Sequence, residues 1–452
     1  MKERNKNILI SAGILGLGAF FVKFIGAVYR IPLTNLLKSD GIGLYQMVFP
    51  IYALLLDFSG AGVPSALSKL IAEKGDDKIV YAQKYLKTSI KFFSVIGLTF
   101  SLFVLLFSNR LSAFQGNINA SLAYKTLCPS IFFVCLISCY RGVFQGLGDM
   151  RPTAFSQIIE QVIKVVLGLI FAYSLKENQV KAVSGATFAI TISEIIAFIY
   201  LFLLYKKTLK HNSLMRIVDA KESISIKKLL KAVVPITLIS LIAPLSQVID
   251  SFLIINLLKN TANATSVYGI YSGVALTIIN LPISVCHGIS VASIPSVSSC
   301  TTESEKTAKV NYLINLTFII SLLASVSVFI LSKPIVKILY PSISVNDRTL
   351  AVNLIKSLSV VIVLLSIVQT QNSIFIARGK YYIPLITMSV SVVIKSVLEI
   401  ILLNNRRLNI FGGAIALITC YFITYLLNFI LIKESGEKNA SKEPNASKLY
   451  NT

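Results

Sequence analysis

Apolar segments long enough to cross a membrane recur along the whole chain, and they constrain its fold more than any other feature. The hydrocarbon core of a bilayer is about 30 Å thick, a distance that a helix of about 20 apolar residues spans. We place twelve such segments at residues 8–29, 44–66, 89–107, 128–147, 154–174, 183–205, 232–257, 267–290, 312–332, 353–376, 382–403 and 411–432. The sequence therefore predicts an all-α polytopic membrane protein with about twelve transmembrane helices.

The composition agrees with lipid as the solvent of these helices. Of the 452 residues, 55% are hydrophobic and 14% are charged, against about 45–50% and about 25% in soluble globular proteins. A formal net charge of +23 would suit a nucleic-acid partner. The Lys and Arg residues, however, punctuate the apolar segments instead of forming a basic domain, so we expect the lipid bilayer and no nucleic acid as a partner.

The distribution of positive charge predicts the orientation. Twelve spans place both chain ends on one side of the membrane. On this topology 27 of the 43 Lys and Arg residues fall on the side of the termini, and 13 fall on the other side. Because loops rich in Lys and Arg stay in the cytoplasm, we expect both termini there.

The second half of the chain repeats the first. VIKVVLGLI at 162–170 returns as VIKSVLEII at 393–401, and SGATFAIT at 184–191 returns as GGAIALIT at 412–419, at offsets of 231 and 228. A direct repeat of six helices enters the membrane the same way round in both halves. We therefore expect two six-helix lobes related by a pseudo-twofold axis along the membrane normal, an architecture typical of transporters.

The repeat and the polar stretches predict the domain boundaries. We expect an N-lobe with helices 1–6 at residues 1–206 and a C-lobe with helices 7–12 at residues 232–433. The longest polar stretch, at 207–231, is the expected cytoplasmic linker. Residues 434–452 are poor in hydrophobic residues and predict a disordered cytoplasmic tail.

Charged residues in or at the ends of the apolar segments are the candidate functional residues. A charge at the bilayer centre costs roughly 2.5–3.5 kcal/mol on insertion scales, so it usually faces protein or a water-filled cavity. The nine candidates are Lys23, Arg30, Asp57, Glu160, Lys164, Glu194, Asp250, Lys395 and Glu399.

Four of these residues form two pairs along single helices. Glu160 and Lys164 stand one helical turn apart, as do Lys395 and Glu399, so each pair can neutralise itself. Two interpretations remain open: structural ion pairs, or charges that line a cavity and gate it.

Three acids lack such a neighbour. Asp250 and Glu194 are candidates for binding a coupling proton or Na⁺. Asp57 precedes glycines and a proline that can bend the helix, so it marks either a polar site at a bend or a helix end at the cytoplasmic surface.

The two cations of the first apolar segment stand seven residues apart. Lys23 and Arg30 would thus share a helix face, about 10 Å apart along the axis. Neither has an acid nearby in its own helix. They either reach lipid headgroups by snorkelling or form a cationic strip in a central cavity, where Arg offers a fork of donors and Lys a point charge to phosphate.

The sequence contains no motif for a disulfide framework, a metal site, a nucleotide site or a catalytic site. None of the six cysteines forms a CxxC pair, and neither histidine has a metal-ligand spacing. There is no GxxxxGK[ST] motif for nucleotide phosphates, and no nucleophile–base pair, so we expect neither an enzyme nor a bound cofactor. RGVFQGLGDMRP at 141–152 predicts a tight cytoplasmic turn with Arg141 and Arg151 at the surface.

Several stretches resemble a known family. KFIGAVYRIPLTNLL (23–37), GLYQMVFPIYALLL (43–56), GAGVPSALSKLIAE (60–73) and YRGVFQGLGDMRPTAFSQIIEQ (140–161) are similar to the polysaccharide-transporter branch of the MATE-like multidrug/oligosaccharidyl-lipid/polysaccharide (MOP) exporter superfamily. Within it the chain resembles the stage V sporulation protein B group, which is related to lipid II flippases.

The resemblance implies two lobes that open alternately to each face of a bacterial cytoplasmic (plasma) membrane. It implies a substrate carried on undecaprenyl pyrophosphate, such as the peptidoglycan precursor lipid II, with Lys23 and Arg30 at the positions of the cations that engage the pyrophosphate. We expect a monomer that is driven by H⁺, Na⁺ or the membrane potential and that works beside cell-wall synthesis proteins.

Three alternatives stay open. The first is an exporter of another lipid-linked polysaccharide or a teichoic-type repeat unit. The second is a cation-coupled multidrug antiporter, which would need acids facing its cavity. The third is a non-transporting scaffold for wall synthesis.

Overall fold

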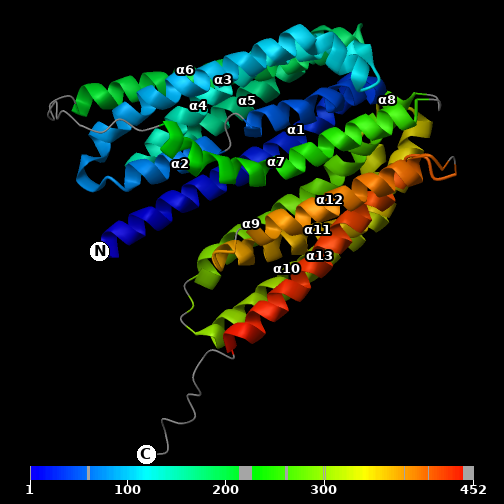
Figure 1. Ribbon diagram of the computed structural model, residues 1–452. Helices are drawn as coiled ribbons and strands as arrows, with labels where there is room; N and C mark the ends of the chain where they lie inside the picture. Colours follow the sequence, from blue (N-terminus) through cyan, green and yellow to red (C-terminus); the bar gives the residue numbers. More distant parts are fainter. Residues whose placement is uncertain are drawn as a thin grey trace, which may run out of the picture. The chain divides into compact units, whose positions relative to one another are not determined.

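The computed structural model describes residues 2–58, 62–212, 226–259, 263–298, 300, 302–380, 382–405 and 407–440. Some of these residues, among them 2–23 and 433–440, are described by their backbone alone. Across the described ranges the secondary structure is helical, without a strand (Figure 1).

The helices follow one another along the chain with short connections. Their bounds are α1 Lys2–Leu56, α2 Gly62–Ala72, α3 Lys78–Phe114, α4 Ser121–Leu147, α5 Arg151–Ser174, α6 Gln179–Asn212, α7 Ile226–Leu257, α8 Ala264–Tyr268, α9 Leu276–Ser298, α10 Glu303–Leu339, α11 Val345–Ala377, α12 Tyr382–Leu403 and α13 Phe411–Ala440. Two 3₁₀ turns, Gly75–Asp77 and Ile118–Ala120, precede α3 and α4, and a π-helix, Gly269–Ala275, joins α8 to α9.

Helix α1 consists of two helical halves that meet at Lys38. This residue has φ 55° and ψ −170°, outside the helical region. The guanidinium carbon of Arg30 lies 5.3 Å from the centre of the Phe49 ring, whereas a straight helix would separate these residues by about 28 Å. The chain therefore reverses at Lys38, and the two halves lie antiparallel.

The number of membrane passes agrees with the sequence. Within the described side chains, eleven helical stretches are long and apolar enough to cross a membrane, and the first of them, Phe24–Leu56, contains the reversal at Lys38. Counting its halves separately gives about twelve passes. The predicted all-α polytopic architecture is thereby confirmed.

The chain divides into two compact units. The first comprises Met1–Val274 with Tyr340–Asp347, and the second comprises Ala275–Leu339 with Arg348–Thr452. The expected lobes at 1–206 and 232–433 stay a prediction. Most of the expected linker, residues 213–225, and the end of the expected tail, 441–452, lie outside the described residues, while α13 continues to Ala440.

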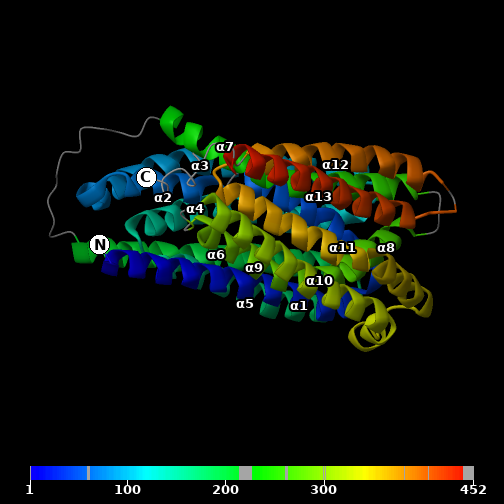
Figure 2. The same cartoon turned by 90° about the horizontal axis from the view of Figure 1, so that it is seen from below.

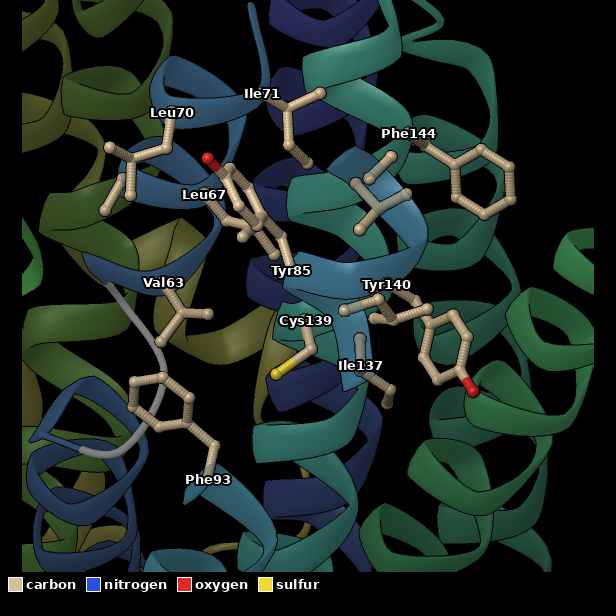
Figure 3. Close-up of a cluster of buried hydrophobic side chains, with 14 of the residues drawn as sticks. Val63, Leu67, Leu70, Ile71, Tyr85, Phe93, Ile137, Cys139, Tyr140 and Phe144 are labelled. Carbon is tan, nitrogen blue, oxygen red and sulfur yellow. The ribbon is translucent and has the colours of Figure 1, made fainter. Parts of the chain in front are cut away.

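The core of the first unit forms where α2, α3, α4, α6 and α7 meet (Figure 3). Val63 and Leu67 of α2, Phe93 of α3 and Tyr140 of α4 are all buried there. Gly142 and Gly146 of α4 lie against α2 so closely that a Cβ atom would come within about 3 Å of its side chains. The absence of side chains at these two positions lets α2 and α4 approach each other.

A buried hydrogen-bond network holds α7 and α8 in the first unit. The Gln115 amide donates to the Met47 carbonyl and to the Ser251 hydroxyl, at 3.0 Å each. Asn117, in the connection that follows α3, donates to the Thr265 hydroxyl of α8 at 2.9 Å. The ends of α3, α7 and α8 are thus joined by polar contacts. Lipid does not weaken these contacts, because it does not compete with the protein for hydrogen bonds.

The segment Tyr340–Asp347 packs in the first unit, although α10 and most of α11, which flank it, belong to the second. Ser39 donates to the Asp347 carboxylate at 2.8 Å. The backbone N–H of Ser342 donates to the Asn35 side-chain oxygen at 3.2 Å. Both hydrogen bonds attach this segment to α1, on either side of the reversal at Lys38.

In the second unit, α12 turns its polar side inward. It packs along α13 (Figure 2), and Thr387, Ser391, Lys395 and Glu399, spaced four residues apart, are buried. The opposite face of α12 exposes apolar side chains, namely Ile386, Val390, Val393, Val397 and Ile401. A helix with polar residues inside and apolar residues outside requires lipid around it.

The backbone at Lys38 carries strain that glycine would relieve. A non-glycine residue with this φ and ψ costs about 1–3 kcal/mol. Lys38→Gly should therefore raise the melting temperature of the purified protein, measured by circular dichroism in detergent. The control, Lys125→Gly, replaces an exposed lysine inside α4 and should lower the melting temperature by the loss of about 1 kcal/mol of helix propensity. A decrease for both variants would contradict a strained Lys38.

Candidate functional site

Charged side chains from four helices meet inside the first unit. We name as the charged cluster Arg30 of α1, Arg141 of α4, Glu160 and Lys164 of α5, and Glu194 of α6. Since α5 packs against both α1 and α6, and α4 against α6, the packing of these helices brings residues far apart in sequence into one place.

Arg141 and Glu160 form the ion pair of the charged cluster. Nη2 of Arg141 lies 3.1 Å from Oε2 of Glu160, and Nε of Arg141 donates to the Ser156 hydroxyl at 2.9 Å. The two charged side chains are only 14% and 18% exposed. The prediction that Arg141 faces the surface is therefore wrong.

The reason for that error lies in the position of Arg141 within α4. The residue precedes the turn by two helical turns and points across to α5, where Glu160 compensates its charge. Arg151, by contrast, is exposed and pairs with Asp149 at 2.9 Å, so its predicted surface position is confirmed.

Glu194 is the buried acid of the charged cluster. Its side chain is on α6 and 2% of the residue is exposed. The Tyr52 hydroxyl donates to its Oε1 atom at 3.2 Å. Its carboxylate also interacts electrostatically with Glu160, Arg141 and Lys164, so it belongs with the charges of α4 and α5.

Lys164 lies within electrostatic range of both acids of the charged cluster and of Arg30. It interacts electrostatically with Glu160, Glu194 and Arg30. The ion pair that Glu160 makes is with Arg141, at 3.1 Å. The expected Glu160–Lys164 ion pair within α5 stays a prediction, since the two residues interact electrostatically while the ion pair of Glu160 is made with another helix.

Arg30 is held by aromatic packing. Its guanidinium stacks over Phe49, and it lies close enough to Tyr45 and Tyr340 to interact with them electrostatically. Such stacking orients the planar guanidinium without consuming its five hydrogen-bond donors. The Lys23 side chain, the other cation of the predicted strip, lies outside the described residues.

The charged cluster carries a formal excess of positive charge. Three cations, Arg30, Arg141 and Lys164, face two acids, Glu160 and Glu194. Because Glu160 is paired with Arg141, the remaining acid, Glu194, opposes two cations. An arrangement of this kind has the capacity to attract an anion.

The other candidate residues lie elsewhere in the two units. Asp250 is on α7 with 7% of the residue exposed, and Asp57 is partly buried in the π-helical residues that directly follow Leu56. In the second unit, the Lys395 ammonium lies 4.0 Å from the Glu399 carboxylate, and the side chains are 1% and 0% exposed. The predicted pair along α12 is confirmed.

The structure offers no protein-based metal centre in its described part. Among the residues of that part, no group of three or more His, Cys, Asp or Glu side chains could hold a metal ion.

Comparison with known proteins identifies relatives over nearly the full chain. Residues 8–301 match the model of a family described as polysaccharide biosynthesis protein. The chain is 25% identical over 438 residues to stage V sporulation protein B of Bacillus subtilis (strain 168), covering 93% of this chain and 81% of that protein. It is also 25% identical over 467 residues to the lipid II flippase MurJ of the same organism, covering 95% and 83%.

Solved structures share the fold. An inward-facing multidrug resistance MATE family transporter of the MOP superfamily matches with a TM-score of 0.75 and 15% identity, over 94% of this chain and 96% of that chain. The lipid II flippase MurJ in an inward closed conformation matches with a TM-score of 0.70 and 18% identity, over 93% and 87%. The predicted MATE-like fold is thereby confirmed.

The Arg141–Glu160 ion pair should matter for stability mainly when it is broken on one side. Glu160→Leu or Arg141→Met leaves a poorly solvated charge, which costs about 3 kcal/mol, while the double variant should recover most of this loss. The measurement is the melting temperature of the purified variants in detergent. As a control, Arg151→Met removes an exposed partner and should leave the melting temperature unchanged. Additive losses in the double variant would argue against a direct pair.

Proposed function

The chain belongs to the polysaccharide biosynthesis protein family, and on this premise we propose that it flips an undecaprenyl-pyrophosphate-linked glycan across the membrane. The observation that carries the proposal is the charge of the charged cluster. Arg141 pairs with Glu160 there, so the two other cations oppose a single acid, Glu194. A diphosphate is the anion that this excess of positive charge and the forked donors of Arg30 suit.

Arg30 has the central role in this proposal. Its guanidinium is oriented by Phe49 and keeps its donors for phosphate oxygens. Lys23, seven residues earlier, would supply a second positive charge. Lys164 would lower the cost of bringing the anion out of water, since a charge buried without partners is strongly destabilised.

The glycan that we favour is that of the peptidoglycan precursor lipid II. Similarity over 93% and 95% of this chain to stage V sporulation protein B and to the lipid II flippase MurJ of Bacillus subtilis supports this choice. A lipid-linked polysaccharide or a teichoic-type repeat unit shares the same diphosphate and is the alternative. A multidrug antiporter is disfavoured because the formal excess in the charged cluster is positive, which repels a cationic drug.

The remaining features of the proposal follow from flipping itself. Moving a lipid headgroup makes and breaks no covalent bond, so we propose no enzymatic step and no cofactor. The protein would work as a monomer in the bacterial cytoplasmic membrane, beside cell-wall synthesis proteins and with both termini in the cytoplasm, as the distribution of Lys and Arg indicates.

Replacement of Arg30 tests the site. In a bacterium depleted of its own lipid II flippase, the wild-type chain should restore growth and the appearance of precursor outside the cell. Arg30→Ala should reduce transport at least tenfold, the loss expected from removing charge-assisted hydrogen bonds worth about 1.5–3 kcal/mol, and Arg30→Lys should recover part of it.

The matched control for this test is Arg110→Ala. Arg110 also stacks on a phenylalanine, at 5.5 Å from the Phe107 ring, but it is exposed at the end of α3. The Arg110→Ala variant should transport the substrate at the wild-type rate. Wild-type activity in Arg30→Ala, at equal amounts of folded protein in the membrane, would remove Arg30 from the substrate site.

Glu194 is the acid that we propose for ion coupling, because its interactions with Lys164 and Arg141 connect it to the charged cluster. In proteoliposomes carrying a fluorescent lipid-linked substrate, Glu194→Gln should abolish the acceleration of transport by a proton or sodium gradient. Asp250→Asn should retain this acceleration. The opposite result would assign coupling to Asp250, the other candidate acid.

A further inference from the structure

A polar pocket lies at the ends of the helices of the first unit, apart from the charged cluster. Its volume is about 270 Å³, and residues from four chain connections line it. These are Asp40, after the reversal of α1; Asn117 and Asn119, between α3 and α4; Gln179, where α6 begins; and Asn263 with Thr265, where α8 begins.

The wall of the pocket is fixed by hydrogen bonds. The Asn117 side chain accepts from the backbone N–H of Asn119 at 3.0 Å and donates to the Thr265 hydroxyl at 2.9 Å. Asn256 of α7 donates to the Phe114 carbonyl at 3.1 Å, and the rings of Phe114 and Phe252 stack with centres 4.5 Å apart. These contacts preorganise the connection between α3 and α4 before any ligand arrives.

Other polar side chains of the lining keep their hydrogen-bonding capacity. Among the residues that the structure describes, the side chains of Asp40, Asn119, Gln179 and Asn263 make no hydrogen bond or ion pair with another residue. Three of the four are amides, each of which has two N–H donors and one oxygen acceptor. The pocket therefore offers donors and acceptors together, supported by a rigid wall.

This mixture identifies the class of ligand. A phosphate would require cations, but the described residues of the lining include one carboxylate and no Lys or Arg. A divalent cation prefers a shell of oxygens with several carboxylates, and N–H donors do not ligate it. The apolar side chains, Leu44, Val180 and Ala264, are too few for an apolar molecule. A neutral ring with several hydroxyl or acetamido groups satisfies the donors and the acceptors.

We propose that this pocket binds a single sugar ring of the glycan headgroup. Its volume of about 270 Å³ lies just below the range of drug-sized sites and suits one ring better than an oligosaccharide. The assignment of that sugar to the transported substrate rests on the proposed function. The first connection of the lining follows the first helical pass, and each later one is separated from the one before it by two passes. All four connections therefore lie on the face opposite the N-terminus, where a flipped headgroup emerges.

The test uses the full-length protein in lipid nanodiscs and free N-acetylglucosamine as the probe. Saturation-transfer NMR should detect the sugar on the wild-type protein. The double variant Asn119→Ala with Gln179→Ala should reduce this signal at least threefold, while Asn109→Ala, which replaces an exposed asparagine of α3 outside the pocket, should leave it unchanged.

A second variant keeps the test independent of the folding of the first. Val180→Trp fills the pocket without removing any of its polar groups, and it should also abolish the sugar signal. Absence of the signal from the wild-type protein, or an unchanged signal in both the double variant and Val180→Trp, would overturn the sugar site.

Geranyl pyrophosphate separates this proposal from the proposed function. Its binding should be lost in Arg30→Ala and retained in the pocket variants, whereas the sugar signal should persist in Arg30→Ala. Sugar binding without any diphosphate binding would refute the diphosphate site and leave the sugar pocket standing. Diphosphate binding without sugar binding would refute the sugar pocket and leave the diphosphate site standing.

Discussion

The cost of placing charge in an apolar medium is the constraint on which the rest of the structure depends. Lipid cannot solvate a guanidinium or a carboxylate, so each charge inside the bundle needs a partner from the protein. Arg141 meets Glu160 across the interface of α4 and α5, and Lys395 meets Glu399 along α12. Because Arg141 and Glu160 come from different helices, the neutralisation of their charges also constrains how α4 and α5 pack.

The charged cluster departs from simple neutralisation, and the transport that we propose depends on this departure. A purely structural set of charges would balance, whereas here two cations oppose the acid left after the Arg141 pair. Arg30 is stabilised in part by the Phe49 ring, which contributes about 0.5–2 kcal/mol. The site thus keeps the guanidinium in place with its hydrogen-bond donors available, at a modest loss of stability.

The sequence was sufficient to predict the helical architecture, because the apolar segments, the reversal between the first two and the i,i+4 pair at Lys395 and Glu399 are all local patterns. It was not sufficient for the charged cluster. The same i,i+4 rule applied to Glu160 points to Lys164, but the ion pair is made with Arg141 of another helix. Spacing along one helix carries no information about which helices become neighbours.

One further feature, the burial of Arg141, was open to a closer reading of the residues. Arg141 lies inside the apolar segment placed at 128–147, so the rule that intramembrane charges face protein applies to it as well. The Asn and Gln residues of three separate connections, by contrast, gave no signal. Each is an ordinary loop residue by itself, and only the packing of α6, α8 and the 3₁₀ turn Ile118–Ala120 against α1 brings them around one pocket.

The segment Tyr340–Asp347 has a mechanical consequence. Since it packs in the first unit while its flanking helices belong largely to the second, the polypeptide passes between the units at three joints, at residues 274/275, 339/340 and 347/348. Any displacement of one unit must be absorbed by backbone rotation at these joints or by release of the two hydrogen bonds to Ser39 and Asn35. At about 1 kcal/mol for the neutral hydrogen bond and about twice that for the one to a carboxylate, release of both costs about 3 kcal/mol.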